Sequence, residues 1–360
     1  MKIIFCTNVP SPYRVDFFNE LGKYCDLTVL YERKSSSERD ASWNKLKAES
    51  FKEIYLDLKP VGVDRARGSA LKNYIKVNRY DILVFTNYVS PATMFAIAWC
   101  RMHGREYYVE YDGGFNRKDS LFKGLLKSFL LKGATAHLST AEEHIGYLIN
   151  KGIPKNRIYK YPFSSVRDAD IEKAMEDHKK GRDYFREILG IKEKKVVLAV
   201  GQFIPRKGFD ILLYAAKHID PNIGVYIVGG IPTQEYITIK EENILENVHF
   251  VGFKSKEELS YYYQVADCFV HPTREDIWGL VVNEALSYGL PVISTDKCIA
   301  ALEMIKDDIN GKIVKSEQIQ ELAEAITDFI NVDTYNESIA TAQLYTIETM
   351  TAAHRKFFIK

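Results

Sequence analysis

The 360-residue sequence lacks the long apolar runs that a membrane span requires. A helix that crosses a bilayer needs about 18 consecutive apolar residues, and the segment 93–100 (TMFAIAWC) is far shorter, which indicates at most a buried helix. The first residues, MKIIFCTNVP, also lack a signal-peptide core and a small-residue cleavage site, and they are typical of a first β-strand. We therefore expect a cytoplasmic protein.

Paired cysteines and clustered histidines are also missing. The eight histidines show no metal-ligand spacing, and the five cysteines are scattered with no CxxC pair: Cys6, Cys25, Cys100, Cys268 and Cys298. This pattern argues against a disulfide framework and a zinc site, and it favours free thiols in a reducing compartment. We expect no metal ion and no cofactor.

The chain also has almost no net charge, but its two halves differ. Residues 1–167 hold 27 Lys and Arg against 17 Asp and Glu, whereas the remaining residues hold 22 against 31. A basic half joined to an acidic half predicts different partners for the two, with a chance distribution as the alternative. We expect no nucleic-acid partner.

Short apolar segments rich in β-branched and aromatic residues alternate with helical patterns along the chain. The predicted strands are 3–7, 27–31, 82–86, 107–111, 136–139, 196–200, 225–228, 248–251, 268–271 and 292–295. The predicted helices are 13–21, 92–102, 121–132, 141–150, 207–218, 256–264, 279–288 and 316–330. Such alternation predicts βαβ units and parallel sheets.

A chain of this length exceeds the usual size of one hydrophobic core, so two domains are expected. The fold class is α/β, with two doubly wound, Rossmann-like domains. We place them at 1–166 and 167–339, and we expect a C-terminal helix at about 340–360 to pack back on the first. Because open α/β sheets bind ligands at the carboxyl ends of their strands, two domains that face each other would enclose a cleft.

The segment 197–216 (VLAVGQFIPRKGFDILLYAA) joins a predicted strand to a predicted helix. Gly201 ends the strand and allows a ligand to approach the backbone, while Arg206 and Lys207 stand beside the start of the helix. This combination suits an anion such as phosphate. The alternative is a surface turn with solvated charges.

Two further strands of this half end in glycines. The segment 226–232 (YIVGGIP) contains Gly229, and the segment 248–263 (VHFVGFKSKEELSYYY) contains Phe253 directly after Gly252. A planar base can lie against backbone exposed at such a turn. Ordinary turn chemistry is the alternative for both.

The segment 271–295 (HPTREDIWGLVVNEALSYGLPVIST) places acids on both sides of a predicted helix start. Glu275 and Asp276 precede Trp278-Gly279, and Glu284 interrupts an apolar run that would pack better without it. A capping role explains one acid but not all three.

These four motifs, in order and spacing, resemble the C-terminal domain of the retaining glycosyltransferases of family 4, which have the GT-B fold. The resemblance covers about 196–313 closely and the rest of the chain by topology. Its most specific element is a pair of acids eight residues apart that flank an aromatic-glycine pair, here Asp276 and Glu284.

The resemblance implies roles for the residues of the donor site. Glu284 matches the acid that accepts hydrogen bonds from ribose hydroxyls, and Asp276 matches the acid that contacts the donor sugar, one methylene shorter than the usual Glu. The neighbouring Glu275 is an alternative for that contact, and the sequence leaves open which of the two points inward. The diphosphate and the base are expected to lie against the following residues: Gly201, Gln202, Gly229, Phe253, Gly279, Leu280 and Val281.

Gln202 departs from the family, whose members usually carry Arg after the glycine of the phosphate loop. Lys207 matches the family's lysine, so the missing charge is expected from Arg206 or from Arg14 in the first half. Weaker stabilisation of the leaving group is one consequence, and a loss of activity is the alternative.

The first half resembles the family less specifically. The segment 7–18 (TNVPSPYRVDFF) follows the first strand, where family members place a glycine-rich loop that faces the donor, and it carries Arg14. The segment 109–119 (VEYDGGFNRKD) places Asp112 where many relatives have a histidine near the reacting sugar. The resemblance makes Asp112 a candidate for orienting the acceptor hydroxyl, and a turn-forming Asp-Gly pair is the alternative.

The Asp-Ala-Asp triplet at 168–170 resembles the metal-binding DxD motif of the other glycosyltransferase fold. It lies in a charged linker with no preceding apolar strand, so we interpret it as a helix cap.

The segment 121–134 (LFKGLLKSFLLKGA) predicts an amphipathic basic helix of the kind that lies on an anionic membrane surface. A core-facing helix with a solvated lysine edge is the alternative. The basic balance of this half favours peripheral membrane contact.

The resemblance implies a metal-independent hexosyltransferase. It would move a hexose or amino-hexose, expected to be UDP-linked, to a lipid-linked or oligosaccharide acceptor with retention at the anomeric carbon, at the inner face of the plasma membrane. One alternative is a GT-B sugar-nucleotide epimerase or hydrolase. The other is a catalytically degenerate glycosyltransferase that acts as a partner subunit, which Gln202 suggests.

Overall fold

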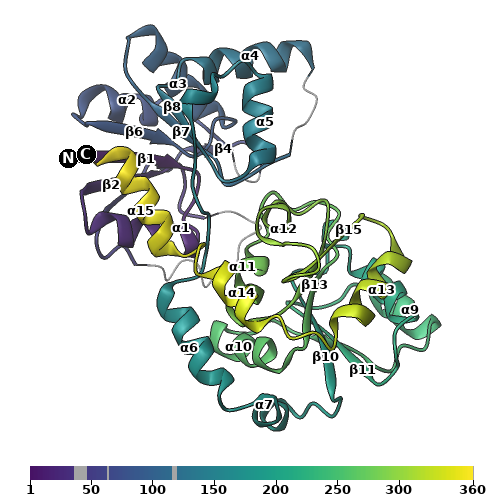
Figure 1. Ribbon diagram of the computed structural model, residues 1–360. Coiled ribbons are helices and arrows are strands. Elements are labelled where there is room, and N and C mark those ends of the chain that lie inside the picture. Colours follow the sequence, from purple (N-terminus) through teal and green to yellow (C-terminus); the bar gives the residue numbers. More distant parts are fainter. Residues whose placement is uncertain (36–46, 63–64, 116–119, 360) are drawn as a thin grey trace. The chain divides into compact units, whose positions relative to one another are not determined.

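The computed structural model describes residues 1–35, 47–62, 65–115 and 120–359, without the side chains of residues 121 and 122. The chain divides into two compact units (Figure 1), the first comprising Met1–Ser165 with Thr346–Lys360 and the second Val166–Tyr345. The boundaries predicted from the sequence were 166/167 and about 340. Within the described residues, no helix combines the length and the apolar character needed to span a bilayer.

The first unit is built on a parallel sheet, described here for the residues given above. Its strand order is β3-β2-β1-β6-β7-β8-β9. The strands are β1 (Lys2–Thr7), β2 (Asp26–Tyr31), β3 (Lys52–Tyr55), β6 (Ile82–Phe85), β7 (Tyr108–Glu110), β8 (Ala136–Ser139) and β9 (Ile158–Lys160). A small antiparallel pair, β4 (Lys59–Pro60) with β5 (Ala66–Arg67), lies outside this sheet. The central strands are buried on both faces, as parallel strands covered by helices must be.

Helices cover this sheet. They are α1 (Pro12–Gly22), α2 (Ala70–Val77), α3 (Pro91–Met102), α4 (Leu121–Lys132), α5 (Glu142–Asn150) and the C-terminal α15 (Ile347–Phe358). Figure 1 shows α15, in yellow, beside α1, against which it packs. The ring centroids of Phe358 and Phe5 of β1 lie 6.4 Å apart, and those of His354 and Phe17 of α1 lie 4.6 Å apart. The last helix thus completes the core of the first unit.

The second unit contains a parallel sheet with the order β12-β11-β10-β13-β14-β15 in the described residues. The strands are β10 (Lys195–Val200), β11 (Ile223–Val228), β12 (Val248–Val251), β13 (Cys268–His271), β14 (Val292–Thr295) and β15 (Gly311–Val314). In sequence order this is 3-2-1-4-5-6, the doubly wound arrangement. The order reverses between β10 and β13, and such a switch point opens a crevice at the carboxyl ends of the strands.

The helices of the second unit flank this sheet. They are α6 (Asp168–His178), α7 (Arg182–Leu189), α8 (Phe209–Ala216), α9 (Gln234–Glu242), α10 (Lys256–Val265), α11 (Leu280–Ser287), α12 (Ile299–Met304), α13 (Ile319–Phe329) and α14 (Tyr335–Ala342). The start of α10 is fixed by a capping box, in which Ser255 Oγ accepts from Glu258 N while the Glu258 carboxylate accepts from Ser255 N.

The Asp-Ala-Asp triplet at 168–170 was expected to lie in a charged linker, and this expectation was wrong. The segment 168–189 forms α6 and α7, and both pack against α10. These two helices bury few apolar side chains: α7 buries Phe185, and α6 buries Ile171 and Ala174. So small an apolar stripe is hidden among charges in the sequence.

Every segment predicted as a strand or helix overlaps an element of the same type, and the predicted α/β fold of doubly wound domains is confirmed. Among the strands that were not predicted, β3 and β9 are the outermost strands of their sheet and are largely exposed or half-buried, which removes the apolar signal. The short pair β4 and β5 and the edge strand β15 were also not predicted.

Candidate functional site

The phosphate-loop motif and the acid motif meet at the switch point of the second unit. The loop after β10 contacts the loop after β13, because Arg274 N and Thr273 Oγ1 both donate to the carbonyl of Arg206 (2.8 and 2.9 Å). Gly208 has φ +69°, and a Cβ on it would lie 2.0 Å from the carbonyl oxygen of Pro272. Only glycine fits this close approach.

The other two motifs join the same edge of the sheet. Gly201 N donates to Val228 O (2.9 Å), and Gly229 N donates to Val251 O (3.1 Å), so the ends of β10, β11 and β12 lie side by side. Phe253 follows β12 and is 69% exposed. The four motifs therefore form one continuous edge, and an exposed aromatic ring lies at the β12 end of it.

Lys207 and Asp276 form the charged centre of this edge. Lys207 Nζ donates to Asp276 Oδ2 at 2.7 Å, and His271 Nε2 lies 3.1 Å from the same oxygen. Burial alone would raise the pKa of the Asp276 carboxyl, but the hydrogen bond from His271 and the charge of Lys207 hold this pKa below its ordinary value. Asp276 is therefore a carboxylate at neutral pH.

His271 is a neutral donor in this arrangement. Its imidazole is fully buried, and burial lowers its pKa. An ionised carboxylate only accepts hydrogen bonds, so Nε2 must carry the proton that faces Asp276. His271 thus fixes the direction of the Asp276 carboxylate from the end of β13.

The structure distinguishes the two neighbouring acids. Asp276 is 8% exposed and faces Lys207, with Arg206 Nη1 at 3.6 Å from its Oδ1. Glu275 is half-buried, and its main-chain carbonyl accepts from Arg206 Nη1 at 2.8 Å. The carboxylate that accepts from Lys207 is therefore that of Asp276.

The helix α11 begins directly after the acid pair. Its N-cap, Gly279, has φ +103°, and a Cβ there would lie 2.6 Å from Cys298 Sγ, so the turn requires glycine. The first amides of a helix have no acceptor within the helix and carry its positive dipole end. Leu280 and Val281 supply such amides next to Lys207 and Asp276, which makes this end of α11 suitable for an oxyanion.

Glu284 lies on the same helix, about one turn further along. Its Oε2 accepts a hydrogen bond of 2.9 Å from the phenol of Tyr263, on α10, and the carboxylate is half-buried. The residues predicted for the donor site in the second half thus lie in the loops after β10, β11, β12 and β13 or on α11.

Gln202 is exposed, and Arg206 is 46% exposed, so neither is fixed as firmly as Lys207, whose side chain is 14% exposed. Arg14, the other candidate for the missing charge, is buried in the first unit and bonded there to Glu110 and Asp112. Its guanidinium is therefore already committed to two carboxylates.

These groups form a charged network in the first unit. Asp112 is bonded to Arg14 and accepts from the phenol of Tyr13 at 3.2 Å, while its own side chain remains 28% exposed. Glu110 is fully buried between Arg14 and His354 Nε2 (2.9 Å). Burial acts to raise the pKa of Glu110, but the charges of Arg14 and His354 lower it to about 2. Residues 116–119 of this predicted motif lie outside the described residues.

Several residues of these networks were not predicted as site residues, among them His271, Tyr263 and Glu110. All three lie within segments quoted in the sequence analysis (271–295, 248–263 and 109–119), but none was singled out there. His271 is the last residue of β13, five residues before Asp276, and this short separation is a sequence signal that could have linked the two. The partners of Tyr263 and Glu110 are 21 and 96 residues away in the sequence, so only the fold reveals them.

The Asp-Ala-Asp triplet caps a helix, as predicted. It forms the first turn of α6, where the Asp170 carboxylate accepts from Arg167 N at 3.1 Å and bonds Lys256 Nζ at 2.8 Å. Among the described residues, no group of three or more His, Cys, Asp or Glu side chains has a geometry that would hold a metal ion.

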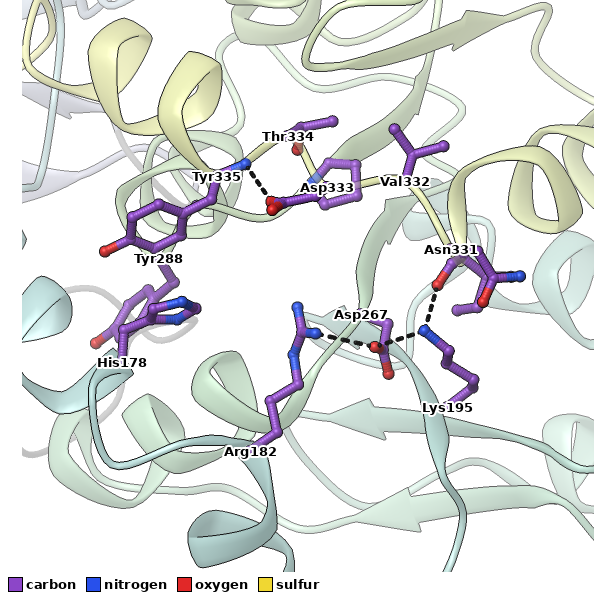
Figure 2. Close-up of a pocket in the computed structure, with 13 residues that line it drawn as sticks. His178, Arg182, Lys195, Asp267, Tyr288, Asn331, Val332, Asp333, Thr334 and Tyr335 are labelled. Carbon is purple, nitrogen blue, oxygen red and sulfur yellow. Dashed lines mark hydrogen bonds and ion pairs between the residues drawn. The ribbon is translucent and has the colours of Figure 1, made fainter.

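A separate pocket of about 180 Å³ lies at the other edge of this sheet, by the amino ends of β10, β13 and β14 (Figure 2). Its charged side chains pair with one another, since Asp267 Oδ1 lies 3.2 Å from Lys195 Nζ and 3.3 Å from Arg182 Nη1. The rings of His178 and Tyr335 stack at 4.1 Å on its wall. Because these groups satisfy each other, we assign no ligand to this pocket.

The comparison with protein families finds a match within the second unit. Residues 181–343 match the family described as "Glycosyl transferases group 1". This part of the chain is therefore similar to the group 1 glycosyltransferases. The matched residues contain the whole edge of the sheet where the four motifs meet.

Curated relatives match about half of this chain or less. A 41.2 kDa protein in the cps region of Klebsiella pneumoniae is 32% identical over 191 residues, which cover 52% of this chain and 50% of that protein. The lipopolysaccharide glucosyltransferase WaaG of Escherichia coli is 30% identical over 157 residues, which cover 41% of each chain. The chain thus spans about half of the length of the first relative and less of the second.

Solved structures match the whole chain. The Anabaena protein HepE, solved in complex with UDP and glucose, superposes with a TM-score of 0.71 at 17% identity and covers 99% of both chains. At this identity the likeness establishes the fold, and the predicted GT-B architecture is confirmed.

Proposed function

We propose that the chain is a retaining hexosyltransferase that uses a nucleotide diphosphate sugar as donor. The observation that carries the proposal is the convergence of Lys207, Asp276, the start of α11 and Glu284 at the switch point of one sheet. A cation and helix amides suit a diphosphate, and a carboxylate further along the helix suits ribose hydroxyls. Neither an isolated surface turn nor a helix cap accounts for all four.

In the proposed reaction, the bond between the anomeric carbon and the diphosphate breaks while the acceptor hydroxyl attacks from the same face. The departing phosphate oxygen takes the proton of that hydroxyl, so the protein supplies no nucleophile. Its contribution is to hold the diphosphate and to stabilise the negative charge that develops there. Lys207 is suited to this because an ammonium has three donors and Asp276 uses one of them.

Asp276 has two consequences for the donor in this proposal. The hydrogen bond from His271 fixes the Asp276 carboxylate, and the charge of this carboxylate holds the Lys207 ammonium in place before the donor arrives. Its Oδ1 remains available to a sugar hydroxyl, apart from Arg206 at 3.6 Å. A fixed carboxylate of this kind suits hydrogen bonding to the hexose, as the family resemblance implies.

For the acceptor, we propose that Asp112 orients the attacking hydroxyl. Its partly exposed carboxylate is held by Arg14 and Tyr13. The buried Glu110 binds the other amino group of the Arg14 guanidinium and so fixes the arginine in turn. An ionised, oriented carboxylate accepts a hydrogen bond from a hydroxyl without needing to remove its proton.

The setting we propose is the assembly of a glycolipid or a cell-surface polysaccharide from UDP-linked donors. The supports are the name of WaaG, the cps-region relative and the UDP bound in HepE. On α4, the side chains of Leu125, Leu126 and Phe129 are 71%, 37% and 48% exposed beside exposed lysines. Apolar and basic side chains together suit an anionic membrane surface, so we propose that α4 contacts the membrane peripherally.

A donor screen by mass spectrometry tests this function and its independence of metal. The purified chain is incubated with UDP-, GDP- and ADP-hexoses and lipid-linked acceptors, with EDTA or with Mg²⁺. We expect a sugar-bearing acceptor and free nucleoside diphosphate at similar rates in both conditions, because Lys207, Arg206 and the start of α11 meet the phosphate charge.

Three results would contradict the proposal in different ways. Nucleotide release or a changed sugar without any acceptor product would favour a hydrolase or an epimerase. Nucleotide binding without turnover on any acceptor would favour a degenerate partner subunit. A strict need for Mg²⁺ or Mn²⁺ would contradict the site as described.

A further inference from the structure

Glu284 has a partner on a neighbouring helix that the donor motif does not include. The phenol of Tyr263 donates to Glu284 Oε2 at 2.9 Å. The side chain of Tyr263 is 2% exposed, and burial together with the Glu284 charge raises the pKa of its phenol well above the ordinary value. Tyr263 therefore remains a proton donor at any physiological pH.

Packing holds Tyr263 in one orientation. Its ring stacks on Tyr288 with centroids 4.9 Å apart and planes 11° apart, and it contacts Phe269 of β13 at 5.8 Å. Tyr288 follows the last residue of α11, while Glu284 lies within that helix. One tyrosine of α10 thus contacts α11 at two points, with its ring at the end and its hydroxyl at the carboxylate.

A glutamate side chain has several rotatable bonds, and each contact that it makes restricts their rotation. Fixing such a side chain before binding removes an entropic cost that the ligand would have to offset. Tyr263 donates a single hydrogen bond, and a carboxylate can accept several, so this bond does not by itself prevent hydroxyls from binding there. The hydrogen bond therefore orients Glu284 without blocking it.

We propose that Tyr263 is the positioning residue that makes the donor site select nucleotides with an intact ribose. The inference rests on the proposed function, in which Glu284 receives the ribose hydroxyls. Tyr263 does not touch the nucleotide. It holds the carboxylate in the direction in which the 2′- and 3′-hydroxyls meet it, and a nucleotide without these hydroxyls gains nothing from that order.

The ratio of two affinities measures this role. The dissociation constants of UDP and 2′,3′-dideoxy-UDP are determined by calorimetry on the full chain and on Tyr263→Phe, which keeps the ring and removes only the hydroxyl. We expect the affinity for UDP to fall by about three- to tenfold, the worth of one hydrogen bond, while that for dideoxy-UDP changes little. The preference for ribose should shrink by the same factor.

Tyr262→Phe is the matched control. Tyr262 is the neighbouring buried tyrosine of α10, at 8% exposure. Its replacement by phenylalanine should leave the affinities for UDP and dideoxy-UDP unchanged. In the Glu284→Ala background, Tyr263→Phe should have no further effect on UDP, because the carboxylate that it orients is gone. Thermal unfolding establishes that each variant is folded.

The outcomes separate the inference from the function on which it rests. Equal weakening of both nucleotides by Tyr263→Phe, an unchanged ratio, or the same loss in the Glu284→Ala background would overturn the positioning role while the donor site stands. Absence of UDP binding by the unaltered chain, together with no binding of other nucleoside diphosphates, would overturn the proposed function and this inference with it.

Discussion

Replacing Lys207 by alanine is expected to lower the rate of sugar transfer by about 10²–10³, the effect of removing one preorganised partner of a developing charge. Negative charge grows on the diphosphate as the glycosidic bond breaks, so a fixed cation there favours the transition state over the bound donor. The effect should be large in this chain because Gln202 replaces the family's usual arginine. Steady-state kinetics measure it.

Two variants frame this measurement. Lys217→Ala removes an exposed lysine just after α8 and should leave the rate unchanged. Gln202→Arg restores the family's charge and should be neutral or slightly activating. Near-normal turnover by folded Lys207→Ala would mean that another residue holds the phosphate, and the site would have to be redrawn around that residue.

Replacing Glu284 by alanine should weaken binding of every nucleotide donor, whatever its sugar. Loss of a hydrogen bond to a charged group costs about 1.5–3 kcal/mol, which corresponds to roughly a tenfold to hundredfold rise in the dissociation constant. Since ribose is common to all donors, free UDP should be affected as strongly as a UDP-sugar. Calorimetric titration of both ligands checks this.

Glu242→Ala, on the exposed side of α9, is the matched control, and it should bind UDP normally. If folded Glu284→Ala keeps the affinity of the unaltered chain, its carboxylate is not the ribose contact. The acid pair would then resemble that of the family in sequence, but Glu284 would not have the role that the family's second acid has.

The sequence was sufficient to place the four motifs at one edge of the sheet because the signals that mark them are local. A buried strand such as β10 gives an unbroken apolar run, and the loop that follows carries Gly201, Lys207 and Gly208 in a fixed order. Parallel strands put their carboxyl ends at one edge of the sheet, so motifs that follow β10 and β13 must come together. The roles of Asp276 and Glu284, in contrast, were assigned from the family resemblance.

The partners of these residues were not accessible in the same way. Whether Asp276 or Glu275 faces Lys207 depends on how the loop after β13 turns, and the answer comes from His271 and the close approach at Gly208. The Tyr263–Glu284 bond depends on the packing of α10 beside α11. Arg14 was expected as a cation for the donor, yet two carboxylates of its own unit surround it.

Hydrogen exchange of the full chain, with and without UDP, tests the central claim that the nucleotide binds at the switch-point edge of the second unit. Bound UDP should slow amide exchange in segments 201–208, 252–254 and 279–284, because it covers these turns and accepts from the first amides of α11. Segments 178–182 and 331–335, at the pocket of Figure 2, should exchange as before. Protection confined to that pocket, with 201–208 and 279–284 unchanged, would contradict the claim.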